Sequence, residues 1–268
     1  MKILFPDNWM QEIIPFIDKQ YDFILLGSMS QMRQLTGEED LSKLIAYNWD
    51  HYSFIDMKNR GDWMKFHKLC KKAKEVWIPT YAHGSYYRAD QQVKSHVTNI
   101  ACVLPHEWDI KNIKDKEYVL FSSRKDTYKR FPFFAEACDL AGIPYKTTHP
   151  EETSREEYIE TLQGCRFYVQ ASLDESLGGL SLMEAVWNQK PVLMSNSILG
   201  GKELYGDSIN YFQWDSKGDL VHKLQVLWEN PTFNPVSKER ISRYTPKGVG
   251  EAINKRLCEL ATLQQAGL

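Results

Sequence analysis

The sequence has few cysteines and no long hydrophobic run. Its five cysteines, at positions 70, 102, 138, 165 and 258, form no C-x-x-C pair. This scatter excludes a zinc-ribbon site and a disulfide framework, and it favours a reducing compartment. No stretch has the length of a membrane span, and the opening residues MKILFPDNWM lack the pattern of a signal peptide. We therefore expect a cytoplasmic protein.

Charge of one sign is not in excess either. The chain has 33 Lys and Arg against 35 Asp and Glu, a formal net charge of -2. The overall balance therefore gives no reason to expect nucleic acid or an anionic surface as partner, although a local patch can still bind one. Repeats and low-complexity segments are absent too, and 268 residues suffice for one large domain or two small ones.

Strands and helices alternate regularly from about residue 118 onward. Strand patterns occupy 118–123, 145–149, 166–172, 191–196 and 209–214, and helical patterns occupy 129–142, 154–165, 180–189 and 217–230. This alternation predicts βαβ units and a parallel sheet covered on both faces. Ser154 followed by Glu157 predicts a capping box at the start of one helix. The second half is therefore expected to be Rossmann-like.

The first half is less regular. Short strands are predicted at 2–6, 21–28, 44–49, 75–80 and 99–105, with helices at 9–18 and 62–74. The charged segment 106–117 is typical of a linker. We predict an α/β fold of two Rossmann-like domains with a cleft between them. They are a reduced first domain at 1–108 and a second at 109–245, followed by a helix at 246–268 that packs back on the first domain or pairs with another copy.

Two segments of the second half carry residues suited to an anionic ligand at the carboxyl ends of the strands. In DESLGG, Gly178 and Gly179 allow the backbone to approach a phosphate, and Glu175 stands at the mouth of the cleft; a flexible turn with a solvated acid fits the spacing equally well. Glu184 is expected near the first turn of the next helix, where it either reaches paired ribose hydroxyls or only favours the helix dipole.

Cations gather after the strand at 118–123. The segment SSRKDTYKR contains Arg124, Lys125, Lys129 and Arg130. Such a group can bind a diphosphate, because Arg forks over two oxygens and Lys supplies a point charge. The alternative is a solvated basic helix start, although cations oppose the dipole there. A second glycine pair, Gly200 and Gly201, follows a later strand and can expose N–H groups to a ligand.

Taken together, these segments resemble the donor-binding core of a known family. The runs ASLDESLGGLSLMEAVWNQKPVLMSNSILGGKELYGD and VLFSSRKDTYKRFPFFAEA resemble glycosyltransferase family 4, whose members have the two-domain GT-B fold. AKEVWIPT and VTNIACVLPHEWD resemble the family's last strands before the hinge. The likeness covers most of 73–245 and is specific over 118–207. It implies transfer of a sugar, with retention, from a nucleotide-diphosphate-sugar donor and without a cofactor.

The resemblance also implies roles for individual residues. Arg124 and Lys129 would hold the donor diphosphate and assist its departure. The backbone at Gly178 and Gly179 would support the same phosphates, and Gly200 and Gly201 would add to the donor site. Glu184 would bind the ribose hydroxyls and Glu175 those of the donor sugar. The family places seven residues between these two glutamates, whereas this chain has eight. No D-x-D pair occurs, so we expect no metal and a cationic clamp instead.

The first half offers candidates for the acceptor side. Asn48, Asp50 and His51 follow a predicted strand, and His83 follows the next one; surface loops are the alternative reading. The helix at 62–77 carries Lys65, Lys68, Lys71, Lys72 and Lys74. Such a helix is most often a solvated face, but it can also bind a polyanionic acceptor such as DNA or an anionic membrane surface.

Three classes of acceptor stay open from the sequence. They are a membrane or surface glycan, a small molecule, and a hydroxymethylated pyrimidine in DNA. The alternative to an enzyme is a non-catalytic relic that binds a nucleotide sugar without turning it over. A third class is another GT-B enzyme, such as an epimerase, which would leave the sugar on its nucleotide.

Overall fold

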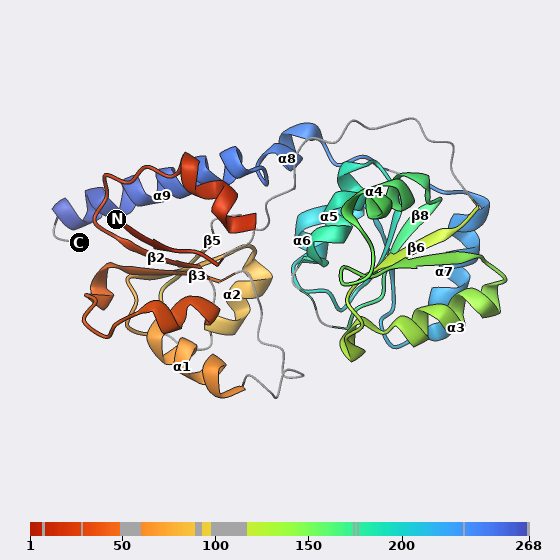
Figure 1. Ribbon diagram of the computed structural model, residues 1–268, viewed down its shortest axis with the longest axis horizontal. Helices are drawn as coiled ribbons and strands as arrows, with labels where there is room; N and C mark the ends of the chain where they lie inside the picture. Colours follow the sequence, from red (N-terminus) through yellow and green to blue (C-terminus); the bar gives the residue numbers. More distant parts are fainter. Residues whose placement is uncertain are drawn as a thin grey trace. The chain divides into compact units, whose positions relative to one another are not determined.

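The computed structural model describes residues 1–6, 9–27, 29–48, 60–88, 93–97, 117–173, 175, 177–232 and 234–266. The chain divides into two compact units, Met1–Pro105 with Lys238–Leu268, and His106–Ser237. Each unit contains a five-stranded parallel sheet with helices packed on it, as Figure 1 shows. The predicted α/β architecture with two Rossmann-like sheets is confirmed. In the described part of the chain, no helix is long and apolar enough to cross a membrane.

The strands of the first unit pair in chain order. They are β1 (Lys2–Leu4), β2 (Ile24–Gly27), β3 (Leu44–Tyr47), β4 (Glu75–Ile78) and β5 (Ser95–Val97). One face of the sheet is covered by the 3-10 helix η1 (Trp9–Phe16) and the C-terminal helix α9 (Pro246–Gln265). The other face is covered by η2 (Met29–Gln34) and α1 (Arg60–Cys70). The short elements η3 (Leu41–Lys43) and α8 (Lys238–Ser242) precede β3 and α9.

Several elements of the first unit differ from the predictions. The helix expected at 9–18 is a 3-10 helix, and it contains Pro15, which lacks the N–H that an α-helical bond needs. Helix α2 (Tyr81–Arg88) and strand β5 were not predicted. The strand predicted at 99–105 lies outside the described residues. Helix α9 packs against η1, and Asn254 of α9 binds the backbone at the end of η1. Its amide donates to the Phe16 carbonyl, and its carbonyl accepts from the Asp18 N–H.

The second unit follows its predicted alternation. The strands are β6 (Val119–Ser122), β7 (Tyr145–Thr148), β8 (Phe167–Gln170), β9 (Val192–Ser195) and β10 (Asn210–Phe212). The helices are α3 (Phe131–Ala141), α4 (Arg155–Gly164), α5 (Gly179–Trp187), α6 (Gly201–Tyr205) and α7 (Lys217–Glu229). Two short 3-10 turns, η5 (Thr127–Lys129) and η6 (Gly206–Ser208), complete it. The predicted cap of α4 is confirmed, since the Ser154 side chain accepts a hydrogen bond from the Glu157 N–H.

The order of the second sheet contains a reversal point. The strands lie in the order β10-β9-β8-β6-β7, all parallel. After β6 the chain forms β7 on one side of β6 and then β8 on the other side. The loops that follow β6 and β8 therefore start at adjacent strand ends and run in opposite directions. Ligands of doubly wound sheets bind at such a reversal point. The segments after β6 and β8 and the start of α5 meet there.

Candidate functional site

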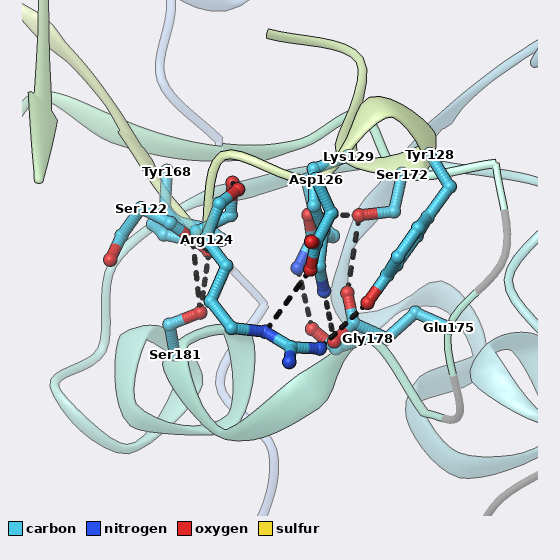
Figure 2. Close-up of polar contacts among 12 residues, drawn as sticks. Ser122, Arg124, Asp126, Tyr128, Lys129, Tyr168, Ser172, Glu175, Gly178 and Ser181 are labelled. Carbon is cyan, nitrogen blue, oxygen red and sulfur yellow. Dashed lines mark hydrogen bonds and ion pairs between the residues drawn. The ribbon is translucent and has the colours of Figure 1, made fainter. Parts of the chain in front are cut away.

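An ion pair between Lys129 and Glu175 lies at the reversal point. Lys129 ends η5, which follows β6, and Glu175 follows β8. The Lys129 Nζ lies 2.5 Å from the Glu175 Oε1, and the two side chains are only 6% and 18% exposed. Figure 2 shows this pair with the polar groups around it. A buried ammonium needs a counter-charge, and Glu175 supplies it.

The end of β8 holds Glu175 in place. The Ser172 hydroxyl is within hydrogen-bond distance of two acceptors, 3.1 Å from the Glu175 Oε2 and 2.9 Å from the Gln170 Oε1. The Gln170 amide donates to the Gly178 carbonyl at 2.6 Å. Side chains of the strand end therefore order both the carboxylate and the glycine loop that follows it.

The glycine loop is left-handed over three consecutive residues. Leu177, Gly178 and Gly179 have φ values of 58°, 85° and 75°. A Cβ on Gly179 would lie 2.5 Å from the Glu175 Oε1, and one on Gly178 would lie 2.7 Å from the Leu182 Cδ1. Glycine is therefore required here both for its backbone conformation and because the carboxylate lies against it. The extra residue between the two glutamates falls in this segment.

Helix α5 begins at this loop and points its amino end at the reversal point. Gly178 is its N-cap and provides no side-chain cap. The Ser181 hydroxyl lies 2.9 Å from the Tyr168 hydroxyl, and both bind the Ser122 carbonyl, at 3.2 and 3.0 Å. Burial raises the pKa of Tyr168 well above its ordinary value, so the phenol stays a donor. The first turn of α5 is thus fixed to β6 and β8, with its dipole favouring an anion.

The four predicted cations separate into two groups. Arg124 lies at the site, where its Nη2 donates to the Tyr128 hydroxyl at 2.7 Å and its Nε lies 3.3 Å from the Asp126 carboxylate. Its side chain is 58% exposed, so a ligand can reach it. Lys125 instead pairs with Glu152, and Arg130 donates to the Trp214 carbonyl and stacks on Phe133. Of these four cations, Lys129 and Arg124 therefore lie at the reversal point.

Glu184 lies deeper in α5 than the sequence predicted. The prediction placed it near the first turn, but α5 begins at Gly179 and Glu184 is in the second turn. The helix begins at Gly179, one residue before the predicted range 180–189. The Glu184 carboxylate is 5% exposed and pairs with Arg155 of α4, with 2.7 Å between Oε1 and Nη2.

Gly200 and Gly201 have a structural explanation. Gly200 caps α6 with φ 73°, and a Cβ on Gly201 would lie 2.3 Å from the Met194 Cε. Packing against β9 therefore accounts for Gly201. A role of this pair toward a ligand stays a prediction.

In the first unit, two predicted acceptor residues share one sheet edge. Asn48 follows β3 and His83 lies in α2, after the neighbouring strand β4. Both are buried, and the His83 Nδ1 lies 2.7 Å from the Thr80 Oγ1. Asp50 and His51 lie outside the described residues.

The predicted lysine surface lies elsewhere on that unit. Lys65, Lys68, Lys71 and Lys72 are exposed, while Trp63 and Phe66 of α1 are buried against the sheet. Lys71 and Lys72 lie between the end of α1 and the amino end of β4. The structure therefore places them at the opposite edge from Asn48 and His83.

The described residues contain no group of three or more His, Cys, Asp or Glu side chains placed to hold a metal ion. The expectation that the donor site works without metal stays a prediction.

Comparison with known proteins identifies the fold. No protein-family model matches the sequence, and no curated protein matches it. Among solved structures, the pneumococcal O-GlcNAc transferase GtfA in complex with UDP and GlcNAc aligns with TM-score 0.65 and 15% identity, over 94% of this chain and 59% of GtfA. TarM aligns with TM-score 0.59 and 14% identity, over 92% of this chain and 54% of TarM. Anabaena HepE in complex with UDP aligns with TM-score 0.59 and 14% identity, over 98% of this chain and 100% of that one.

The chain therefore spans little more than half the length of TarM and GtfA and the whole of the aligned HepE chain. At such identities the likeness shows the fold, while the narrower resemblance to family 4 stays a prediction. The protein has the GT-B fold of these glycosyltransferases.

Proposed function

We propose that the protein is a glycosyltransferase that takes a sugar from a nucleotide-diphosphate donor bound at the carboxyl edge of the second sheet. The observation that carries this proposal is the meeting of the buried Lys129 with the amino end of α5 at the reversal point of that sheet. The names of the neighbours support it, since GtfA and HepE were solved with UDP.

Each group of the site would bind a different part of the donor. The ammonium of Lys129, the exposed guanidinium of Arg124 and the free N–H groups of α5 would bind the diphosphate. The phosphate would replace Glu175 as the partner of Lys129, which frees this carboxylate for the hydroxyls of the sugar. Glu184 would bind the ribose hydroxyls at the other end of the donor.

The same groups would assist the chemistry. As the bond between the sugar and the diphosphate breaks, negative charge grows on the leaving phosphate oxygen. Lys129, once it has exchanged Glu175 for the phosphate, would stabilise this charge together with Arg124 and the α5 amino end. The family resemblance implies that the acceptor hydroxyl attaches on the face the diphosphate leaves, with retention, while its proton passes to the leaving phosphate. The lack of a D-x-D pair favours transfer without metal.

The acceptor is open to three classes: a glycan, a small molecule, or a hydroxymethylated pyrimidine in DNA. The exposed lysines of α1 support a polyanionic acceptor or an anionic surface that carries it. We also propose a cytoplasmic location, because all four cysteines in the described part of the chain are free thiols.

A non-catalytic relic is the second candidate, favoured by the engagement of Lys129 with Glu175 and by the extra residue in the loop. The two candidates differ in one observable. Both bind a nucleotide sugar, but only the enzyme releases the nucleoside diphosphate and transfers or hydrolyses the sugar.

The test is calorimetric titration with UDP, GDP, ADP, CDP and TDP, followed by product analysis with the matching sugar donors and the three acceptor classes. Lys129→Ala should weaken binding of the preferred diphosphate about 10- to 100-fold, the range expected for a lost charge-assisted hydrogen bond. Lys125→Ala removes a cation from the same loop and serves as the matched control. If no nucleoside diphosphate binds, or if both variants bind like the wild type, the proposal is wrong.

A further inference from the structure

Arg155 occupies an unfavourable position for a cation. It is the first residue of α4, directly after the cap Ser154, where the partial positive charge of the helix repels it. Its guanidinium nevertheless points to α5, with Nη2 2.7 Å from the Glu184 Oε1, and its Cζ lies 5.2 Å from the Tyr158 ring centre. Glu184 is therefore what stabilises a cation at this place.

The two side chains of the Arg155–Glu184 ion pair differ in burial. The Arg155 side chain is 44% exposed, whereas that of Glu184 is 5% exposed. Glu184 is thus the more buried partner, and the part-exposed guanidinium of Arg155 lies against its carboxylate. Tyr158 lies against the same carboxylate, and burial first, then the charge of Glu184, raises its pKa well above the ordinary value. The phenol therefore stays neutral, and Arg155 is the cation that the described residues bring to Glu184.

The pair lies beside the proposed donor site. Helix α4 begins after β7 and helix α5 after β8, and these strands flank β6 on its two sides. A carboxylate has about four lone-pair positions, and Arg155 takes one of them through a single oxygen. The others suffice for two vicinal hydroxyl groups.

We infer that Arg155 is a positioning residue that holds the Glu184 carboxylate for the ribose of the donor, so that the preference for ribonucleoside over 2′-deoxyribonucleoside diphosphates depends on Arg155. This inference rests on the proposed function of the site. If the ion pair of Arg155 and Glu184 only joined α4 to α5, its loss would lower the free energy of unfolding. It would not change the ratio of the affinities for ribonucleoside and 2′-deoxyribonucleoside diphosphates.

The experiment measures the dissociation constants of UDP, GDP and ADP and of their 2′-deoxy counterparts by calorimetry. Proteins to compare are the wild type, Arg155→Ala, Arg155→Gln, Arg155→Lys and Glu184→Gln. Arg243→Ala is the matched control, because Arg243 pairs with Glu239 at the surface of the other unit. Arg155→Gln keeps part of the side-chain stem in case the alanine variant does not fold.

The wild type should prefer the ribonucleotide about tenfold or more, as expected for a hydroxyl bound by a carboxylate. The preference should fall below about threefold in Arg155→Ala, Arg155→Gln and Glu184→Gln, and it should return in part with Arg155→Lys. A wild type without the preference, or neutral Arg155 variants that keep it in full, would overturn the inference while the proposed function stands. If no diphosphate binds the wild type, the proposed function itself fails and the inference falls with it.

Discussion

At the scale of single residues, Gly179 joins the backbone conformation of the loop to the position of Glu175. Its φ is 75°, and a Cβ there would lie 2.5 Å from the Glu175 Oε1. We expect Gly179→Ala to lower the free energy of unfolding by about 1–2 kcal/mol, the cost of a left-handed non-glycine residue. It should also displace Glu175 from Lys129 and strongly reduce sugar transfer. Urea unfolding and a donor turnover assay measure the two effects.

The control is Gly218→Ala in the first turn of α7, where nothing lies within 4 Å of an added Cβ. This change should leave turnover unaltered and stabilise slightly, by less than about 1 kcal/mol. Equal turnover in the two variants would show that the Gly179 contact with Glu175 has no part in the activity.

The type and spacing of residues in the sequence singled out the residues of the candidate site, but they could not show which of them lie together. Lys125 and Arg130 belong to the same basic run as Arg124 and Lys129. Their contacts with Glu152 and Trp214 come from segments 27 and 84 residues away along the chain. The partnership of Glu184 with Arg155 was missed for the same reason, because nothing local in the sequence pairs these two helices.

At the scale of secondary-structure elements, α9 is held to the first sheet by a buried ion pair. Arg256 binds both oxygens of Glu75 at the start of β4, at 2.6 and 3.0 Å, and the two side chains are 17% and 10% exposed. Arg256→Ala leaves the Glu75 carboxylate buried without its cation, so we expect the first unit to lose about 3 kcal/mol of unfolding free energy. Hydrogen exchange of the α9 amides measures it.

Lys247→Ala, which breaks an exposed pair with Glu251 on the same helix, should cost less than about 0.5 kcal/mol. Nucleotide binding by the second unit should be the same in both variants. A stable α9 in Arg256→Ala would show that the apolar contacts with η1 alone hold this helix.

The same elements predict a dependence on pH. Burial first, then the nearby Arg256, lowers the pKa of His96 on β5 below its ordinary 6.5, although Glu75 and Glu259 oppose this shift. The unfolded chain therefore takes up the proton first, and the stability that His96 contributes is lost as pH falls through about 6.5. The unfolding free energy of His96→Gln should change less between about pH 7.5 and 5.5 than that of the wild type.

His222→Gln, on α7 in the other unit, is the control for this change. Urea unfolding at a series of pH values compares the three proteins. The prediction is wrong if His96→Gln keeps the full pH dependence of the wild type.

Elements could be predicted where periodicity and burial agree. In the second unit three strands are fully buried, among them Val119–Ser122 and Val192–Ser195, and every predicted strand and helix was found. Strand β5 was missed because Ser95 and His96 give it no apolar pattern; its pairing with β4 comes from the tertiary structure. Glu184 was expected near the first turn of α5 and lies in the second turn, because the limits of a helix are the least certain part of a prediction from spacing.

At the scale of the whole molecule, the chain has a GT-B fold and aligns with little more than half the length of TarM or GtfA. The second unit keeps a complete doubly wound sheet with its reversal point, and the first unit adds α9, which comes from the end of the chain. The donor site described above lies within the second unit alone. Donor affinity and acceptor use are therefore expected to respond to different sets of substitutions.

Turnover of the complete chain tests whether protein cations replace a metal ion. A donor diphosphate needs its charge neutralised as the sugar leaves, and a divalent cation or fixed cations can do this. Here the buried Lys129 and the exposed Arg124 follow β6, α5 begins after β8, and the sequence has no D-x-D pair. We expect the transfer rate in excess EDTA to stay within about twofold of the rate in Mg²⁺, whereas Arg124→Ala should reduce it about 10- to 100-fold under both conditions. Loss of activity in EDTA that Mg²⁺ or Mn²⁺ restores would show instead that a metal ion shares the diphosphate with these residues.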